Sequence, residues 1–154
     1  MARVVTEIER SKPSIGVRLL ETTDPAALES PVLAHASNGV NGDPIGKLAA
    51  FRHSLGSGIG DKVDVAVVKL CWADFSPDTN TDGLFSEYKA TMADLKAAYP
   101  HVTFVHVTVP LTVTQAGVRA LVKASLGKPV FGLKENVVRH RYNELISHEY
   151  RGHA

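Results

Sequence analysis

The chain has 154 residues, of which 44% are hydrophobic and 21% are charged, and its formal net charge is +1. This length suits one domain with a buried core, and the composition excludes an intrinsically disordered protein. The near-neutral charge gives no reason to expect nucleic acid or an anionic membrane as a partner. The single cysteine, Cys71, excludes an internal disulfide and a zinc site built from several thiolates.

No segment has the character of a leader or of a membrane span. Residues 1–13 carry charged side chains throughout, so they lack the apolar core of a secretory leader. The longest apolar run, residues 65–73, is interrupted by Lys69 and is far too short to cross a bilayer. We therefore expect a soluble, cytoplasmic protein without a membrane partner.

The first half of the chain alternates apolar runs with helix signals. Asp43 can accept hydrogen bonds from the free N–H groups that begin a helix, and Pro44 is tolerated at the first helical position. Residues 63–71 form a near-continuous β-branched run, which is typical of a central parallel strand buried on both faces. In chain order we expect a short helix over 2–10, a strand over 15–20, an extended stretch over 32–36, a helix over 43–55 and a strand over 63–71.

The second half continues the alternation. Asp82 is expected to cap a helix that Pro100 stops, and one face of this helix is apolar. That face consists of Leu84, Phe85, Tyr88, Met92, Leu95 and Tyr99. After it we expect a strand over 102–109, a helix over 115–126 and a longer helix over 135–150. Strands that alternate with helices predict one α/β domain around a mostly parallel sheet.

Ligands of such folds bind beyond the carboxyl ends of the strands, which directs attention to loops 35–43, 72–82 and 110–115. The glycine cluster at 56–60 follows a helix and precedes a strand, so it is interpreted as a turn and not as a phosphate loop. The segment 35–44 instead leads into a helix N-terminus. There Gly39 would allow close backbone approach, and Asn41 could donate a side-chain N–H to an oxyanion. A ligand-free loop of turn-forming residues is the alternative.

Other polar residues near these loops have both functional and structural interpretations. Ser37 with His35 could form a nucleophile and base, but no acidic partner is evident, so a structural role is favoured. Asp74, just past the strand over 63–71, suits a polar role at the working edge. Cys71 is interpreted as a small buried hydrophobe. His106 is interpreted as a hydrogen-bonded core or edge histidine, and no histidine pair has convincing metal-ligand spacing.

Several phrases stand in a recognisable order along the chain. They are VRLLETTDPAAL at 17–28, LAHA at 33–36, GVNGDP at 39–44, VKLCWADF at 68–75, LFSEY at 84–88 and FVHVTVPLT at 104–112. Together they resemble a poorly characterised bacterial branch of the SGNH (GDSL-like) hydrolase family, over roughly residues 5–150. The resemblance implies a flavodoxin-like three-layer α/β/α fold. It also implies hydrolysis of O-acyl esters on small molecules, carbohydrates or lipids, with no metal or organic cofactor.

Site residues follow from the resemblance one position at a time. Gly39 fits the family's oxyanion glycine, whereas Asp74 stands where an asparagine is expected. The family's serine block and its C-terminal Asp-x-x-His block have no counterpart here, so Ser37 is not the family nucleophile. By this resemblance the chain is the middle of an SGNH-type domain. We expect it to lack serine-hydrolase activity of its own.

Two further functions remain open beside an incomplete ester hydrolase. One is a noncatalytic binding or assembly module that retains the fold and the loop 39–43. The other is a flavodoxin-like small-ligand protein, which is disfavoured because no phosphate-specific loop follows a strand. A missing strand would leave sheet edges exposed, and exposed edges invite pairing, so homo-oligomerisation is also expected.

Overall fold

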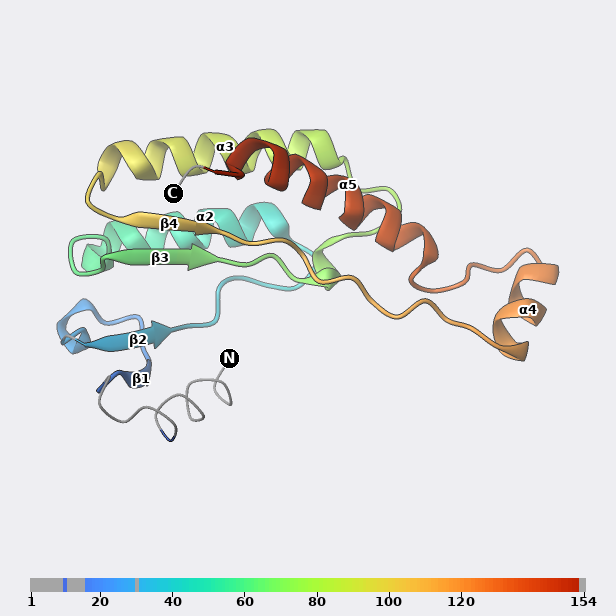
Figure 1. The fold of residues 1–154 in the computed structure, drawn as a ribbon, viewed down its shortest axis with the longest axis horizontal. Helices are drawn as coiled ribbons and strands as arrows, with labels where there is room; N and C mark the ends of the chain where they lie inside the picture. Colours follow the sequence, from blue (N-terminus) through green and yellow to red (C-terminus); the bar gives the residue numbers. More distant parts are fainter. Residues whose placement is uncertain (1–9, 11–15, 30, 153–154) are drawn as a thin grey trace.

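The structure is a computed structural model, and it describes residues 10, 16–29 and 31–152. Helices make up 49% of it and strands 12%. The strands form two parallel pairs, which confirms a mixed α/β chain with parallel strands (Figure 1). The predicted helix over 2–10 lies outside the described residues apart from Arg10, and so does Ile15 at the start of the first predicted strand.

The first pair joins β1 (Arg18–Glu21) to β2 (Val32–His35), with Leu19 opposite Leu33. The crossover between them is short. Asp24 begins a 3-10 turn, η2 (Pro25–Ala27), by accepting a hydrogen bond from the Ala26 N–H at 2.9 Å. The prediction of a second extended segment is confirmed, and a single tight turn replaces the helix that parallel crossovers usually contain.

The second pair joins β3 (Val65–Val68) to β4 (Thr103–His106). Both strands are shorter than the predicted 63–71 and 102–109. After β4 the chain is held by a helix side chain instead of a neighbouring strand, since Asn143 accepts from the Val109 N–H at 2.7 Å and donates to the Val109 carbonyl at 2.9 Å. The strand ladder ends at His106, and the backbone at Val109 pairs with this side chain.

The helices begin at side-chain caps for reasons visible in the sequence. In α2 (Pro44–Ser54), Asp43 accepts from the Gly46 N–H at 2.8 Å, as predicted. In α3 (Thr81–Ala98) the cap is Asn80 and not the predicted Asp82, which lies inside the first turn. Asparagine caps a helix as well as aspartate does, so the sequence alone could not separate the two. Two helices follow β4, namely α4 (Val118–Ser125) and α5 (Leu133–Tyr150).

The core lies between the β3–β4 pair and helices α2, α3 and α5, where α3 contacts both of the other two. The apolar face predicted for α3 is confirmed, with Tyr88 only 2% exposed. The buried members of this cluster are Leu48, Val68, Leu70, Phe75, Leu84, Phe85, Tyr88, Met92, Val109, Tyr142 and Ile146. A fully buried side chain of this kind stabilises the fold by about 1.5–3 kcal/mol.

The opposite face of β3 and β4 is bare among the described residues. Val65, Val67 and Val105 are 56%, 45% and 42% exposed, whereas the alternate residues Ala66 and Val68 are buried. The expectation of a central strand covered on both faces is therefore wrong for the described residues. The β-branched run follows the strand's preference for such side chains, and it does not report coverage of both faces.

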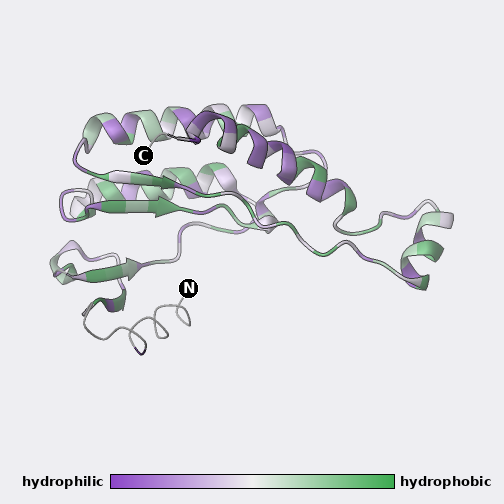
Figure 2. Ribbon diagram, viewed as in Figure 1, coloured by the Kyte–Doolittle hydropathy of each residue, from purple (hydrophilic) through white to green (hydrophobic). Residues whose placement is uncertain are grey.

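The segment after β4 extends away from the core and carries α4 at its far end (Figure 1). Its apolar side chains are exposed, including Leu121 at 70% and Val113 at 90%. Figure 2 shows this apolar character on α4 as well as on the strands. Within the described part of the chain, no helix is long and apolar enough to span a bilayer.

The glycine cluster forms the turn between α2 and β3, as predicted. It is a π-helical turn, η3 (Leu55–Ile59), in which Gly58 has a φ of 104°. A side chain at that backbone angle would be strained, which explains the glycine. The position before a strand, and not after one, excludes a phosphate loop of the usual kind.

Candidate functional site

The candidate site is organised by a buried ion pair between Lys47 of α2 and Asp74. Asp74 lies in η4 (Trp72–Asp74), the short 3-10 turn that follows β3. The Lys47 Nζ lies 2.9 Å from Asp74 Oδ1 and 2.8 Å from Oδ2, and the two side chains are 7% and 0% exposed. Desolvated charges of this kind persist only when they are paired and hydrogen-bonded.

Backbone groups complete the partners of Asp74. The Gly42 N–H donates to Oδ1 at 2.9 Å, and the Cys71 N–H donates to Oδ2 at 2.6 Å. Asp74 thereby ties the loop 38–43 to the end of β3. With both oxygens occupied, its carboxylate is not available as a base or as a ligand. Asp74 was predicted to have a polar role at this edge. In this geometry the role is structural, because its carboxylate holds the loop to the end of β3.

Gly39 lies against the aliphatic stem of Lys47. Its φ is 69°, and a Cβ built on it would come within 2.9 Å of the Lys47 Cγ. The Gly39 N–H makes no hydrogen bond within the described part of the chain. Loop 38–43 therefore lies next to Asp74. The N–H that donates to the Asp74 carboxylate is that of Gly42, whereas the Gly39 N–H has no partner in the described part of the chain.

Among the described residues, the side-chain amide of Asn41 makes a hydrogen bond through its oxygen but not through its nitrogen. Its Oδ1 accepts from Lys47 Nζ at 2.9 Å, and because an ammonium only donates, the oxygen must face the lysine. The Nδ2 donors then point away from Lys47, and they have no partner among the described residues. Asn38 fixes the other end of the loop, since its Nδ2 donates to the Lys47 carbonyl at 2.8 Å. Two unused donors, the Gly39 N–H and the Asn41 Nδ2, thus belong to one well-anchored loop.

The N-terminus of α2 itself is closed. Asp43 already accepts from the Gly46 N–H, and a Cβ at Gly46 would collide with the Asp43 carboxylate. Asp43 therefore satisfies one of the free N–H groups at the start of α2 and places a negative charge there. The capping carboxylate has taken the place an anion would occupy.

Ser37 is exposed, His35 is half-buried, and no hydrogen bond joins them in the described structure. Across the same residues, no serine, threonine or cysteine side chain is hydrogen-bonded to a histidine. A nucleophile needs an adjacent base to be active at neutral pH. The described residues therefore contain no assembled nucleophile–base pair.

His106 is satisfied, as predicted, although it contributes to packing more than the sequence suggested. Its Nδ1 lies 2.8 Å from the Tyr88 hydroxyl, and its ring stacks on Tyr150 at 3.6 Å. Burial, with a smaller contribution from the charge of Lys96, lowers the pKa of the His106 imidazole. Cys71 was expected to be fully buried, but it is half-buried at the residue that precedes η4.

A second polar group at the same edge was not predicted. Arg139 of α5 is 1% exposed, and its Nε donates to the Trp72 carbonyl at 3.1 Å. Its Nη1 donates to Thr112 Oγ1 at 2.8 Å and to Asn136 Oδ1 at 2.7 Å. Arginine on a long helix usually indicates a solvated face, so this buried contact could not be predicted from the sequence.

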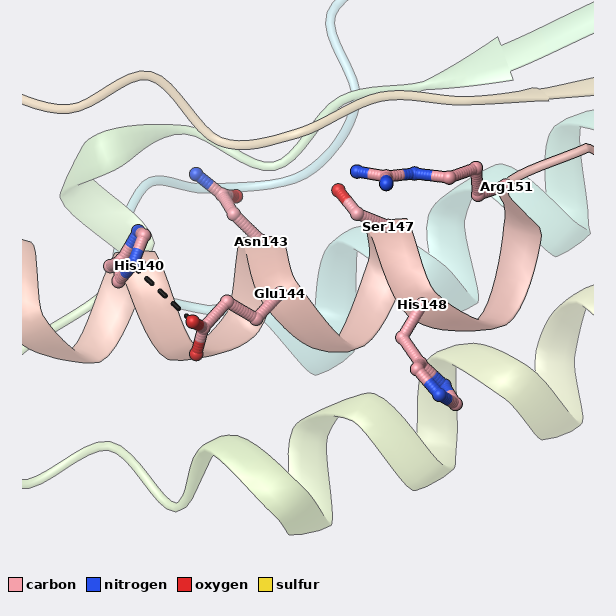
Figure 3. Close-up of a pocket in the computed structure, with 6 residues that line it drawn as sticks. All are labelled: His140, Asn143, Glu144, Ser147, His148 and Arg151. Atoms are coloured by element: carbon pink, nitrogen blue, oxygen red, sulfur yellow. Dashed lines mark ion pairs between the residues drawn. The ribbon is translucent and has the colours of Figure 1, made fainter.

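One open hollow of about 630 Å³ runs along α5 (Figure 3). His140, Glu144 and His148 lie on one side of the helix, and Asn143, Ser147 and Arg151 lie on another. Ser147 and His148 therefore point apart and form no catalytic pair. His140 Nε2 lies 3.4 Å from Glu144 Oε1, but no group of described residues could hold a metal ion. His140, Glu144 and His148 share one side of α5 because four residues separate each from the next.

Comparisons with models of protein families, with curated proteins and with solved structures returned no match.

Proposed function

We propose that this chain is part of an SGNH-type domain that acts on O-acyl esters, and that it supplies the loop that holds the oxyanion. The observation that carries the proposal is the Lys47–Asp74 pair, which fixes loop 38–43 against the end of β3. Stabilising an oxyanion requires donors that are held in place before the reaction. The Gly39 N–H and the Asn41 Nδ2 are two such donors on this loop.

The same proposal assigns no turnover to this chain alone. Hydrolysis of an ester needs a nucleophile and a base within hydrogen-bond reach, and the described residues contain no such pair. Asp74 cannot serve as the base, because both of its oxygens accept from buried or backbone donors. Ser37 remains an exposed residue without a base.

A three-layer fold is also part of the proposal. The bare face formed by Val65, Val67 and Val105 supports it, because an apolar sheet face of this kind is normally covered by helices in a parallel α/β domain. In the described part of the chain β2 pairs only with β1, and β3 pairs only with β4. Each has a second edge at which a further parallel strand could pair.

The loop is tested with butylphosphonate, a tetrahedral anion that resembles the intermediate of ester hydrolysis. We expect the backbone amide signal of Gly39 to shift saturably in nuclear magnetic resonance titrations. Asn41→Ala removes the amide donors without adding a charge that would itself repel the anion, and it should weaken binding about tenfold or more. If the Gly39 signal does not move while the protein stays folded, the oxyanion role of this loop is refuted.

The bare valine face and the unpaired strand edges also favour a second candidate, a noncatalytic assembly module. Exposed edges and apolar faces invite association with another chain. This candidate predicts a dimer or larger assembly whose population rises with concentration in light scattering. A monodisperse monomer over a wide concentration range would count against it.

A further inference from the structure

The guanidinium of Arg139 is buried without a counter-ion. Its side chain is hydrogen-bonded only to neutral acceptors, which are the Trp72 carbonyl, Thr112 Oγ1 and Asn136 Oδ1. No carboxylate of a described residue lies within 4.0 Å of it, although every other buried charge in that part of the chain, Lys47 and Asp74, is paired. Burying an unpaired charge is costly, and neutral hydrogen bonds offset only part of that cost.

The acidic residue best placed to neutralise Arg139 is occupied elsewhere. Glu135 stands one helical turn earlier on α5, the spacing at which glutamate and arginine usually pair. Instead, its Oε2 accepts from the Gly132 N–H at 2.9 Å and caps the helix. The other carboxylate near the turn that carries Trp72 is Asp74, and Lys47 already balances its charge. No carboxylate of the described residues therefore balances the positive charge of Arg139.

One nitrogen of the guanidinium has no hydrogen-bond partner among the described residues. The Nε and Nη1 atoms have partners, whereas Nη2 has none. Among the described residues, the only side-chain polar atom that is both sealed from solvent and without a partner is the Tyr142 hydroxyl. Arg139 Nη2 is therefore not completely sealed, and although the side chain as a whole is only 1% exposed, a narrow opening leads to its N–H donors.

Two exposed aromatic rings stand next to this guanidinium. The guanidinium carbon of Arg139 lies 5.8 Å from the centre of the Trp72 ring, and Trp72 meets Phe131 edge to face at 6.2 Å. The two residues are 43% and 46% exposed. Ligand sites combine apolar and aromatic surface with a few placed polar groups, so rings beside a guanidinium suit a small molecule with one anionic and one apolar end.

We propose that Arg139, Trp72 and Phe131 form a binding site for a small organic anion, with a carboxylate at Arg139 Nη2 and its apolar part on the two rings. A guanidinium suits this task because it stays charged at all relevant pH values and forms strong hydrogen bonds to oxyanions. The site does not use loop 38–43, so it stands whether or not the chain belongs to an ester hydrolase.

The test uses the fluorescence of Trp72, the single tryptophan in the sequence. Butanoate is titrated into the whole chain at constant ionic strength, with butanamide as the matched neutral ligand and inorganic phosphate as an anion without an apolar end. We expect a saturable change with butanoate, none with butanamide, and weaker binding of phosphate. Phosphate binding as tight as butanoate would support the anion site and overturn the part assigned to the rings.

Substitutions separate the two halves of the site. Arg139→Gln should weaken butanoate binding about tenfold or more, as expected for the loss of one charge-assisted hydrogen bond. Phe131→Ala, at an exposed position, should weaken butanoate but not phosphate. If Arg139→Gln does not fold, the Arg139 side-chain nitrogen signals of the wild-type chain provide the same answer in nuclear magnetic resonance. Absence of a shift with butanoate, or an unchanged affinity in folded Arg139→Gln, would overturn the proposal.

Discussion

Replacing Lys47 by methionine should destabilise the fold strongly. Lys47→Met keeps most of the side-chain length but leaves the Asp74 carboxylate, which is 0% exposed, with only the Gly42 and Cys71 N–H groups as partners. Removing one member of a buried ion pair costs about 3–5 kcal/mol, because the other charge stays buried and uncompensated. We therefore expect the free energy of unfolding to fall by that amount, measured by urea denaturation.

The matched control is Lys89→Met. Lys89 makes an ion pair with Glu149 at 2.8 Å, the same distance as the shorter Lys47 contact, but the two side chains are 43% and 35% exposed. A surface pair of this kind contributes about 0–1 kcal/mol. The difference between the two variants therefore isolates the effect of burial.

A double-mutant cycle with Asp74→Asn completes the test. If the two charges depend on each other, the double variant should be more stable than the sum of the single effects predicts, by roughly 0.5–3 kcal/mol. A loss below about 1 kcal/mol for Lys47→Met, or a cycle that is simply additive, would refute the reasoning that this pair anchors loop 38–43.

The remaining predictions concern single positions. Gly39→Ala should lose about 1–3 kcal/mol, because its φ is 69° and its Cβ would clash with the buried lysine, whereas Gly42→Ala has no such clash and should lose less in the same denaturation experiment. The lowered pKa of His106 implies stability that is fully present above the ordinary value of 6.5 and is lost as the pH falls through the folded pKa. The test compares the free energy of unfolding at pH 7 and at pH 5. A loss at pH 5 in the parent chain that is absent in His106→Gln would confirm that His106 causes it. Tyr142→Phe removes a buried hydroxyl without a partner and should leave stability unchanged or raise it, whereas Tyr88→Phe removes a hydrogen bond and should lower it, so a large loss in the first variant would contradict the assignment.

The parts of the fold that the sequence predicted are those governed by local rules. Asp43 and Pro44 begin a helix because of capping chemistry, and the apolar face of α3 is buried as its spacing requires. The turn at 56–60 follows from its glycines and its position. These features depend on neighbours along the chain, which a sequence displays directly.

The contacts that organise the site are not local. Lys47 and Arg139 look like solvated helix residues in the sequence, and each becomes buried only because a distant turn supplies its acceptors. The bare face of Val65 and Val67 was mispredicted for a related reason, since a β-branched run reports strand preference and not what lies on each side. The candidate loop and the Asp43 cap at the start of α2 were both predicted, because both are local features of the sequence.

The central claim is that this chain carries an oxyanion loop without an assembled nucleophile, and active-site labelling tests it most directly. The whole chain is incubated with a fluorophosphonate probe, while short-chain p-nitrophenyl esters report any turnover. The account predicts no stoichiometric labelling and no ester hydrolysis above the uncatalysed rate, because Ser37 has no base within reach. Stoichiometric labelling of Ser37, abolished by Ser37→Ala, would contradict it and make Ser37 the nucleophile.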